Sequence, residues 1–293
     1  MSKTILGRKM FAIGTVERDT GISRDTLRIW ERRYGFPTPG RNNKGERVYS
    51  AEQIQRLQRI RRLLDQGFRP GKVVPLEEEA LNKLANTLHD LLLSPRDMDP
   101  THIRLIDLAS SGDIPTLNAA LEQLLAQEGL SSFVLDTFAP LTKAVGELWA
   151  AGRLQIFEEH ILTRHLVRFL DVAMSRVGHP PGNPEVLLGT LPGEPHALGL
   201  LMAEALLINS GRATLNLGTD VPLDEIVTAA ERSGVSTVAL SFSGCYTRNT
   251  IRDDLEELAE RLPRAVRIWI GGDGVRRLRR LPPSVEIMSL ESI

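Results

Sequence analysis

Five short apolar runs, separated by longer amphipathic stretches, dominate the last third of this 293-residue chain. The runs cover residues 186–191, 213–217, 237–242, 266–270 and, more weakly, 285–288. The stretches between them, at 197–210, 222–233 and 248–261, have helical patterns. This alternation is typical of a parallel, doubly wound sheet, in which each strand is joined to the next by a crossover helix. We therefore predict a flavodoxin-like (Rossmann-like) α/β domain over residues 181–293.

The middle of the chain has a helical pattern throughout. Asp113 precedes a stripe of apolar residues spaced three or four apart, and further helices are expected at 130–150 and 155–177. Apolar-striped helices with short connections predict a four-helix bundle over residues 101–180. We expect residues 76–100 to be a connecting helix and linker.

Charge is distributed unevenly between the ends of the chain. Residues 1–75 contain 17 Lys and Arg against 7 Asp and Glu, so the remaining residues carry a net charge of −11. A basic head on an acidic body is typical of a nucleic-acid-binding domain joined to another module. A basic face that is merely solvated is the alternative.

The basic head has a helix-turn-helix pattern. A short helix begins at residues 13–16, Gly21 makes a turn, and Ser23 can cap a second helix. The arginines of that second helix suit insertion into a major groove, and the Gly/Asn-rich loop 40–45 suits a β-ribbon wing lying on phosphates. We expect Leu27 and Trp30 to lie in the core and Glu31 to pair with a neighbouring arginine. The residues expected to contact DNA are Arg24, Arg28, Arg32, Arg33, Tyr34, Arg41, Asn43, Lys44, Arg47 and Tyr49.

Residues 13–16, 21–23, 26–35 and 47–49, taken in order, resemble the winged helix-turn-helix of the MerR family. The resemblance implies a homo-oligomer, a dimer or a tetramer, on a near-palindromic site in double-stranded promoter DNA. Metal-sensing members bind their ions with cysteines. The single cysteine, Cys245, excludes that kind of site and any intrachain disulfide, so the effector is expected to be something else.

The amino-acid composition indicates which broad class of protein this is. Hydrophobic residues make up 42% and charged residues 25%, as in soluble globular proteins. No apolar run approaches the roughly 18 residues that cross a bilayer, and we expect no secretory signal. We therefore predict a cytoplasmic protein without a membrane partner. The sequence has no coherent Ser/His/Asp or paired-carboxylate pattern, so an enzyme is not expected.

One loop of the predicted sheet carries a possible metal ligand. His196 follows the first strand, at the edge of the sheet where ligands bind, and Glu194 lies two residues before it. A carboxylate that orients a histidine is a common arrangement around metals. A structural or incidental histidine is the alternative.

The surroundings of His196 resemble the cobalamin-binding fold of methionine synthase and the mutases, whose motif is Asp-x-His-x-x-Gly followed by Ser-x-Leu and Gly-Gly. The counterparts here are Glu194, His196 and Gly199, then Ser241 and Ser243, then Gly271 and Gly272. Glu replaces Asp in this chain, and Ser243 replaces Leu.

The resemblance implies a role for each of these residues. His196 would bind the cobalt from below, as the metal ligand, and Glu194 would hold its imidazole. Gly199 would let a helix pack beside the buried nucleotide tail, and Ser241 would hydrogen-bond that tail. Gly271 and Gly272 would allow close approach of the backbone.

In the helical segment, Trp149 followed by Glu159 and His160 resembles the cap of cobalamin-dependent MerR-type photoreceptors. That family implies a repressor in which these three residues cover the upper face of adenosylcobalamin and light changes the oligomer. Ala150 stands where light-sensing members commonly have a histidine, so the resemblance supports the cofactor better than the light response. A regulator that senses another ligand or a protein partner remains the alternative. A corrinoid methyltransferase or mutase module is a third reading, against which the basic head argues.

Overall fold

The computed structural model describes residues 10–65, 68–84, 98–150, 153–178, 180–244, 246, 248–276 and 278–293. Internal contacts divide the chain into two units. The first contains Met1–Asp97 with Glu147–Arg153, and the second contains Met98–Gly146 with Leu154–Ile293. The predicted bundle and sheet therefore belong largely to one unit. The domain boundaries predicted above stay predictions, and most of the connecting helix, as well as Cys245, lies outside the described residues.

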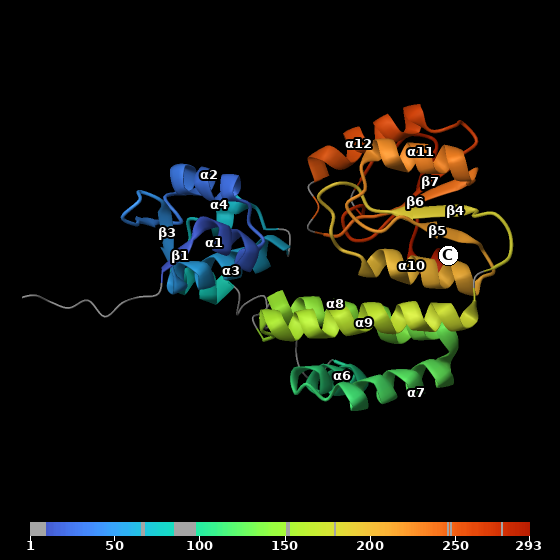
Figure 1. The fold of residues 1–293 in the computed structure, drawn as a ribbon, viewed down its shortest axis with the longest axis horizontal. Coiled ribbons are helices and arrows are strands. Elements are labelled where there is room, and N and C mark those ends of the chain that lie inside the picture. Colours follow the sequence, from blue (N-terminus) through green and yellow to red (C-terminus); the bar gives the residue numbers. More distant parts are fainter. Residues whose placement is uncertain are drawn as a thin grey trace, which may run out of the picture. The chain divides into compact units, whose positions relative to one another are not determined.

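The first unit is a small helical domain with a three-stranded sheet (Figure 1). Its elements are β1 (Met10–Ala12), α1 (Ile13–Thr20), α2 (Arg24–Tyr34), β2 (Gly40–Arg41), β3 (Arg47–Ser50), α3 (Ala51–Asp65) and α4 (Pro70–Val73). The antiparallel strand order is β1-β3-β2. The predicted pair of helices and the wing are confirmed. Strand β1 was not predicted, because three residues are too few for a visible alternation.

One buried cluster joins the helices and the sheet of the first unit. Val16 of α1, Leu27 and Trp30 of α2, and Leu57 of α3 are buried in one cluster, as predicted for Leu27 and Trp30. Tyr49 of β3 belongs to the same cluster and is fully buried. Tyr49 was predicted to contact DNA; its side chain has no exposed surface, so the structure does not support this contact.

The second unit begins with helices. They are α6 (Pro100–Ser110), α7 (Ile114–Ser132), the π-helix η1 (Phe133–Phe138), α8 (Ala139–Ala150) and α9 (Ile156–Val177). The end of α8, from Glu147 onward, belongs to the first unit. Asp113 caps α7 and accepts a hydrogen bond from the backbone of Thr116 at 3.2 Å. Gly129, with φ 76° and ψ 164°, breaks the helical backbone just before the helix predicted at 130–150, and the π-helix η1 lies inside that predicted helix. None of the described helices is long and apolar enough to cross a membrane.

A five-stranded parallel sheet completes the second unit. Its strands are β4 (Val186–Gly189), β5 (Thr214–Asn216), β6 (Thr237–Ser241), β7 (Arg267–Gly271) and β8 (Val285–Ile287). Helices α10 (Leu198–Asn209), α11 (Leu223–Ser233) and α12 (Arg248–Arg261) connect them, and a short 3-10 helix, η2 (Leu290–Ser292), ends the chain. The order β5-β4-β6-β7-β8 is that of the flavodoxin-like fold, so the predicted fold class is confirmed. Strand β5 is added on one side of β4, and β6, β7 and β8 are added on the other, so the strand order reverses between β4 and β6.

The two faces of this sheet are covered differently (Figure 1). Helices α11 and α12 pack on one face, where Leu187, Val238 and Ile268 are buried. Helix α10 packs on the other face, over Val186 and Leu188. The far side of α10 contacts α7 and α9 of the bundle. A helix covered on both sides must be apolar nearly all round, and most of α10 is buried.

The loop after β7 depends on a glycine with a positive φ. Gly272 has φ +95°, and a Cβ atom there would lie 2.3 Å from the carbonyl oxygen of Phe242. We expect Gly272→Ala to lower the free energy of unfolding by at least about 3 kcal/mol, since it adds overlap to backbone strain. Chemical denaturation measures this loss. The matched control is Gly234→Ala, which has φ +66° but open space and should cost about 1 kcal/mol. Equal losses in the two variants would contradict the steric argument.

The Tyr49 hydroxyl is buried and has no hydrogen-bond partner among the described residues. Burial raises the pKa of this hydroxyl. Removing an unsatisfied polar group costs little, so Tyr49→Phe should leave stability unchanged or raise it by about 1 kcal/mol, whereas Tyr49→Ala should lose about 3–5 kcal/mol. Thermal unfolding tests this pair. If Tyr49→Phe weakened DNA binding at unchanged stability, the Tyr49 hydroxyl would contribute to DNA binding in spite of its burial.

Candidate nucleic-acid interface and histidine site

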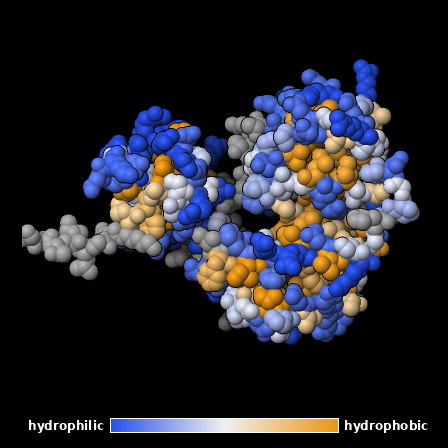
Figure 2. Space-filling view, viewed as in Figure 1, coloured by the Kyte–Doolittle hydropathy of each residue, from blue (hydrophilic) through white to orange (hydrophobic). Residues whose placement is uncertain are grey.

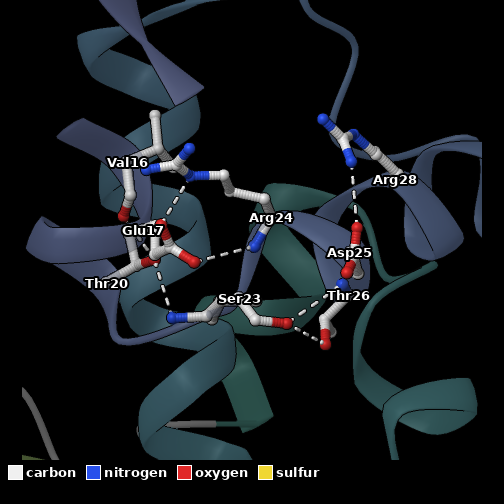
Figure 3. A network of polar contacts seen from close by, with 9 residues as sticks. Val16, Glu17, Thr20, Ser23, Arg24, Asp25, Thr26 and Arg28 are labelled. Atoms are coloured by element: carbon white, nitrogen blue, oxygen red, sulfur yellow. Dashed lines mark hydrogen bonds and ion pairs between the residues drawn. The ribbon is translucent and has the colours of Figure 1, made fainter. Parts of the chain in front are cut away.

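Side-chain hydrogen bonds fix the turn between α1 and α2 (Figure 3). Gly21, with φ 66°, ends α1, and its N–H donates to the Glu17 carbonyl. The Thr20 hydroxyl donates to the Val16 carbonyl at 2.7 Å. Ser23 caps α2 by accepting from the Thr26 N–H at 3.2 Å, as the sequence predicted. The start of α2 is therefore rigidly placed.

Glu17 holds the first predicted DNA-contacting arginine (Figure 3). Its carboxylate accepts from Arg24 Nε at 2.7 Å and from the Arg24 backbone N–H at 3.2 Å. These bonds hold the pKa of the exposed Glu17 carboxyl below its ordinary value. A Cβ on Gly14 would lie 3.2 Å from the Arg24 guanidinium, so this side chain lies back against α1. Sequence reasoning did not identify the role of Glu17, because nothing in its spacing shows the contact.

The other arginines of α2 lie on the exposed side of the helix. Arg28 donates to Asp25 at 2.9 Å, and its side chain is half exposed. Arg32 and Arg33 are exposed, and the Arg33 guanidinium lies 5.5 Å from the centre of the Tyr34 ring. The surface over α2 is mainly hydrophilic in Figure 2. This side of α2 has the charge and the freedom from core packing that a groove-binding helix needs.

The wing between β2 and β3 is held by Asn42, which was not among the predicted site residues. The Asn42 side chain accepts from the N–H groups of Lys44 and Glu46, each at 2.9 Å. Arg41 donates to the Gly45 carbonyl at 2.6 Å, and the predicted residues Arg41, Asn43 and Lys44 are exposed. An asparagine two residues before a Lys-Gly pair is a turn signal that could have indicated this role.

Arg47 joins the wing to α2. Its Nε donates to Glu31 at 2.8 Å, and both side chains are partly buried. The hydrogen bond to Glu31 raises the pKa of Arg47. The prediction that Glu31 pairs with an arginine is thus confirmed. Arg47 fixes the wing against the helix, and its predicted DNA contact stays a prediction.

In the second unit, the loop that carries His196 lies at the point between β4 and β6 where the strand order reverses. Strand β4 ends at Gly189 and α10 begins at Leu198, so His196 is at the carboxyl edge of β4. Strand β6 is the neighbour of β4, and the loop after it carries Ser243. Ligands of open α/β sheets bind at this kind of position.

The Glu194 carboxylate links these two loops. Its Oε1 lies 2.5 Å from His196 Nδ1, and its Oε2 accepts from the Ser243 backbone N–H at 2.7 Å. Glu194 is 1% exposed, whereas the His196 side chain is 49% exposed. Burial raises the pKa of the Glu194 carboxyl, but the bonds from His196 and Ser243 outweigh burial, so its pKa lies below the ordinary value. The carboxylate therefore stays ionised and orients the imidazole.

Glycines bring the backbone close together beside this pair. A Cβ on Gly199, at the start of α10, would lie 2.8 Å from the Ser241 hydroxyl. A Cβ on Gly271 would lie 3.2 Å from the Met288 carbonyl. The structure thus places Glu194, His196, Gly199, Ser241 and Ser243 around one edge of β4 and β6. It also shows that Gly272 is required by the chain's own backbone.

With Nδ1 bonded to Glu194, His196 would coordinate a metal through Nε2. Gly199 lies close to Ser241, and a residue larger than glycine would not fit there. These two small residues are of the kind that a buried ligand tail needs beside it. These two observations fit the lower half of the predicted corrinoid site.

The residues predicted for the upper half lie on helices. On α9, His160 Nδ1 lies 2.5 Å from Glu159, which also accepts from the Thr163 hydroxyl at 2.6 Å. The His160 side chain is 73% exposed. Trp149 belongs to the first unit, where its ring centre is 5.5 Å from the Arg62 guanidinium. The roles of these three residues stay predictions.

Comparisons with known proteins identify domains in two segments of the chain. Residues 11–79 match the family described as MerR HTH family regulatory protein, and residues 103–173 match the family described as B12 binding domain. The chain is 26% identical to the HTH-type transcriptional repressor CarH of Myxococcus xanthus over 276 residues, which cover 92% of this chain and 91% of CarH. It is 29% identical to the repressor CarA of the same organism over 271 residues, which cover 90% of this chain and 87% of CarA.

An enzyme is also similar to part of the chain. Methionine synthase of Mycobacterium tuberculosis is 25% identical over 188 residues, which are 61% of this chain but 15% of the enzyme. So small a share of the enzyme does not extend its activity to this chain. The two family matches cover the helix-turn-helix domain and the helices that precede the parallel sheet, and the two repressors match about nine-tenths of the chain. The chain therefore combines a MerR-type helix-turn-helix domain with a B12-binding domain.

Proposed function

We propose that the chain is a cytoplasmic transcriptional repressor, not an enzyme, whose DNA binding is controlled by adenosylcobalamin. The observation that carries the proposal is the Glu194–His196 pair at the edge of β4, in a chain that also has a MerR-type DNA-binding domain. Similarity to the repressors CarH and CarA over about nine-tenths of the chain supports it.

The DNA-binding part of the proposal rests on α2 and the wing. Arg28, Arg32 and Arg33 would enter the major groove, where guanidinium groups can donate to base edges or phosphates. Arg41 and Lys44 at the tip of the wing would contact the phosphate backbone. A MerR-type domain reads one half of a near-palindromic site, so the acting species would be a homo-oligomer, a dimer or a tetramer.

The cofactor part rests on the residues around β4 and β6. His196 would bind cobalt through Nε2, while Glu194 holds Nδ1 and keeps the ring in one orientation. Ser241 and Gly199 would accommodate the nucleotide tail, and Trp149, Glu159 and His160 would cover the upper face. Adenosylcobalamin would supply a cobalt–carbon bond that light can break.

Control would follow from differential binding. A cofactor that binds one oligomeric state more tightly shifts the chain toward that state, and the state with paired DNA-binding domains holds the operator. Light would reverse this shift. Ala150 stands where light-sensing relatives commonly have a histidine, so the light response is tested separately from the cofactor.

The full chain, mixed with adenosylcobalamin in darkness and passed through a desalting column, should retain a corrinoid absorption spectrum. Glu194→Gln should lower the affinity about 10-fold, as expected for a residue that orients a metal ligand, and His196→Ala should lower it further. His165→Ala, a half-buried histidine on α9 without an assigned role, is the control. A folded wild-type chain that binds DNA but acquires no corrinoid would support the alternative, a regulator that senses something else.

Illumination of the loaded wild-type protein should change its mass in solution, measured by light scattering, and weaken operator binding by about 5–150-fold, the usual range of coupling between two sites. Protein loaded with cyanocobalamin, which has no adenosyl group, controls for heating. Ala150→His should slow the return of DNA binding in the dark. Unchanged mass and DNA affinity after complete photolysis would exclude light as the signal while leaving the cofactor assignment intact.

A further inference from the structure

The loop that carries Glu194 and His196 is attached at its base to a buried threonine. Thr190 directly follows β4 and is fully buried. Its hydroxyl donates to the Glu194 carbonyl at 2.6 Å and accepts from the Asp220 N–H at 2.9 Å. One hydroxyl therefore connects the histidine loop to the loop that follows β5.

The Asp220 side chain makes a second hydrogen bond between the same two loops. Its carboxylate accepts from the Gly193 N–H at 2.6 Å, directly before Glu194 in the chain. Asp220 itself has φ 62°, in the left-handed region, which Asp tolerates better than most residues. Gly193 also has a positive φ, of 86°. Backbone in such conformations persists only where its surroundings hold it in place.

These contacts fix the backbone on which the predicted ligand depends. Asp220 holds Gly193, Thr190 holds the Glu194 carbonyl, and the Glu194 side chain then reaches His196 and Ser243. The His196 side chain is half exposed, and its Nδ1 bonds to Glu194. The hydrogen bonds that hold the Glu194 backbone therefore also help to orient the imidazole.

We propose that Thr190 and Asp220 are positioning residues that hold the Glu194–His196 pair in the geometry that binds the lower face of a corrinoid. This inference rests on the function proposed above. Without the two anchors, the loop would occupy the binding geometry for only part of the time, and the apparent affinity falls by that fraction.

The most informative substitution is Asp220→Gly. Glycine tolerates the φ of 62°, so this variant removes the carboxylate and little else. Asp220→Asn keeps an oxygen that can accept from Gly193 and should behave like the wild type. The matched control is Arg280→Gly, since Arg280 also has a positive φ, 58°, and lies in another loop. Thr190→Val and Thr190→Ser form a second pair, in which only the serine keeps the hydroxyl.

Two measurements separate positioning from general stability. In the protein without cofactor, amide hydrogen exchange at Gly193 should be faster in Asp220→Gly than in Arg280→Gly. In protein loaded with cob(II)alamin, the nitrogen splitting from an axial imidazole in the electron paramagnetic resonance spectrum should weaken, and affinity should fall about 10-fold. Asp220→Asn and Thr190→Ser should retain both signals. Thr190→Val should reproduce the loss, which covers the case in which Asp220→Gly does not fold.

The outcomes distinguish this inference from the function on which it rests. If the wild type shows no histidine-ligated corrinoid, the proposed function and this inference fall together. If the wild type binds through His196, and Asp220→Gly and Thr190→Val keep its affinity and its nitrogen splitting, the positioning role alone is overturned. Faster exchange at Gly193 with unchanged ligation also overturns it, because the anchors would then serve only the loop.

Discussion

The buried carboxylate of Glu194 is the interaction on which the histidine site depends. An ionised group that is 1% exposed costs several kcal/mol unless hydrogen bonds compensate it, and here His196 and the Ser243 N–H do so. Because these two donors come from loops after different strands, the compensation exists only when β4 and β6 are neighbours. The position of the imidazole therefore depends on the strand order of the sheet.

Helix α10 imposes the second constraint. It begins directly after the histidine loop and is apolar nearly all round, so it must be covered by the sheet on one side and by α7 and α9 on the other. This explains why the bundle and the sheet, predicted as separate domains, fall largely in one contact unit. It also fixes the N-terminal end of α10, where Gly199 approaches Ser241.

The fold of the second unit could be predicted closely because its signals are local. Each apolar run bounded by Gly, Pro or polar residues became a strand within one or two residues of its predicted limits. The errors have non-local causes. The π-helix η1 interrupts an otherwise α-helical pattern, and β1 forms only because β3 pairs with it. Tyr49 looks like a wing residue in the sequence, yet the core encloses it.

In the histidine site, too, local signals could be predicted and non-local contacts could not. Glu194 and His196 could be found because they are two residues apart, whereas Ser243 contributes a backbone N–H and Asp220 a carboxylate from another loop, and no spacing marks either of them. An arginine count likewise predicts a basic head but not which charges are already satisfied.

In the helix-turn-helix domain, Arg24, Arg28 and Arg47 each bond to a carboxylate. A neighbouring carboxylate partly offsets the charge of each of these arginines, while their remaining N–H groups are still donors. In the DNA complex proposed above, the sequence-independent attraction to phosphate would therefore be weaker than the number of arginines suggests. Glu17, Asp25 and Glu31 would in this way favour discrimination over affinity, as complementary charges do at other interfaces.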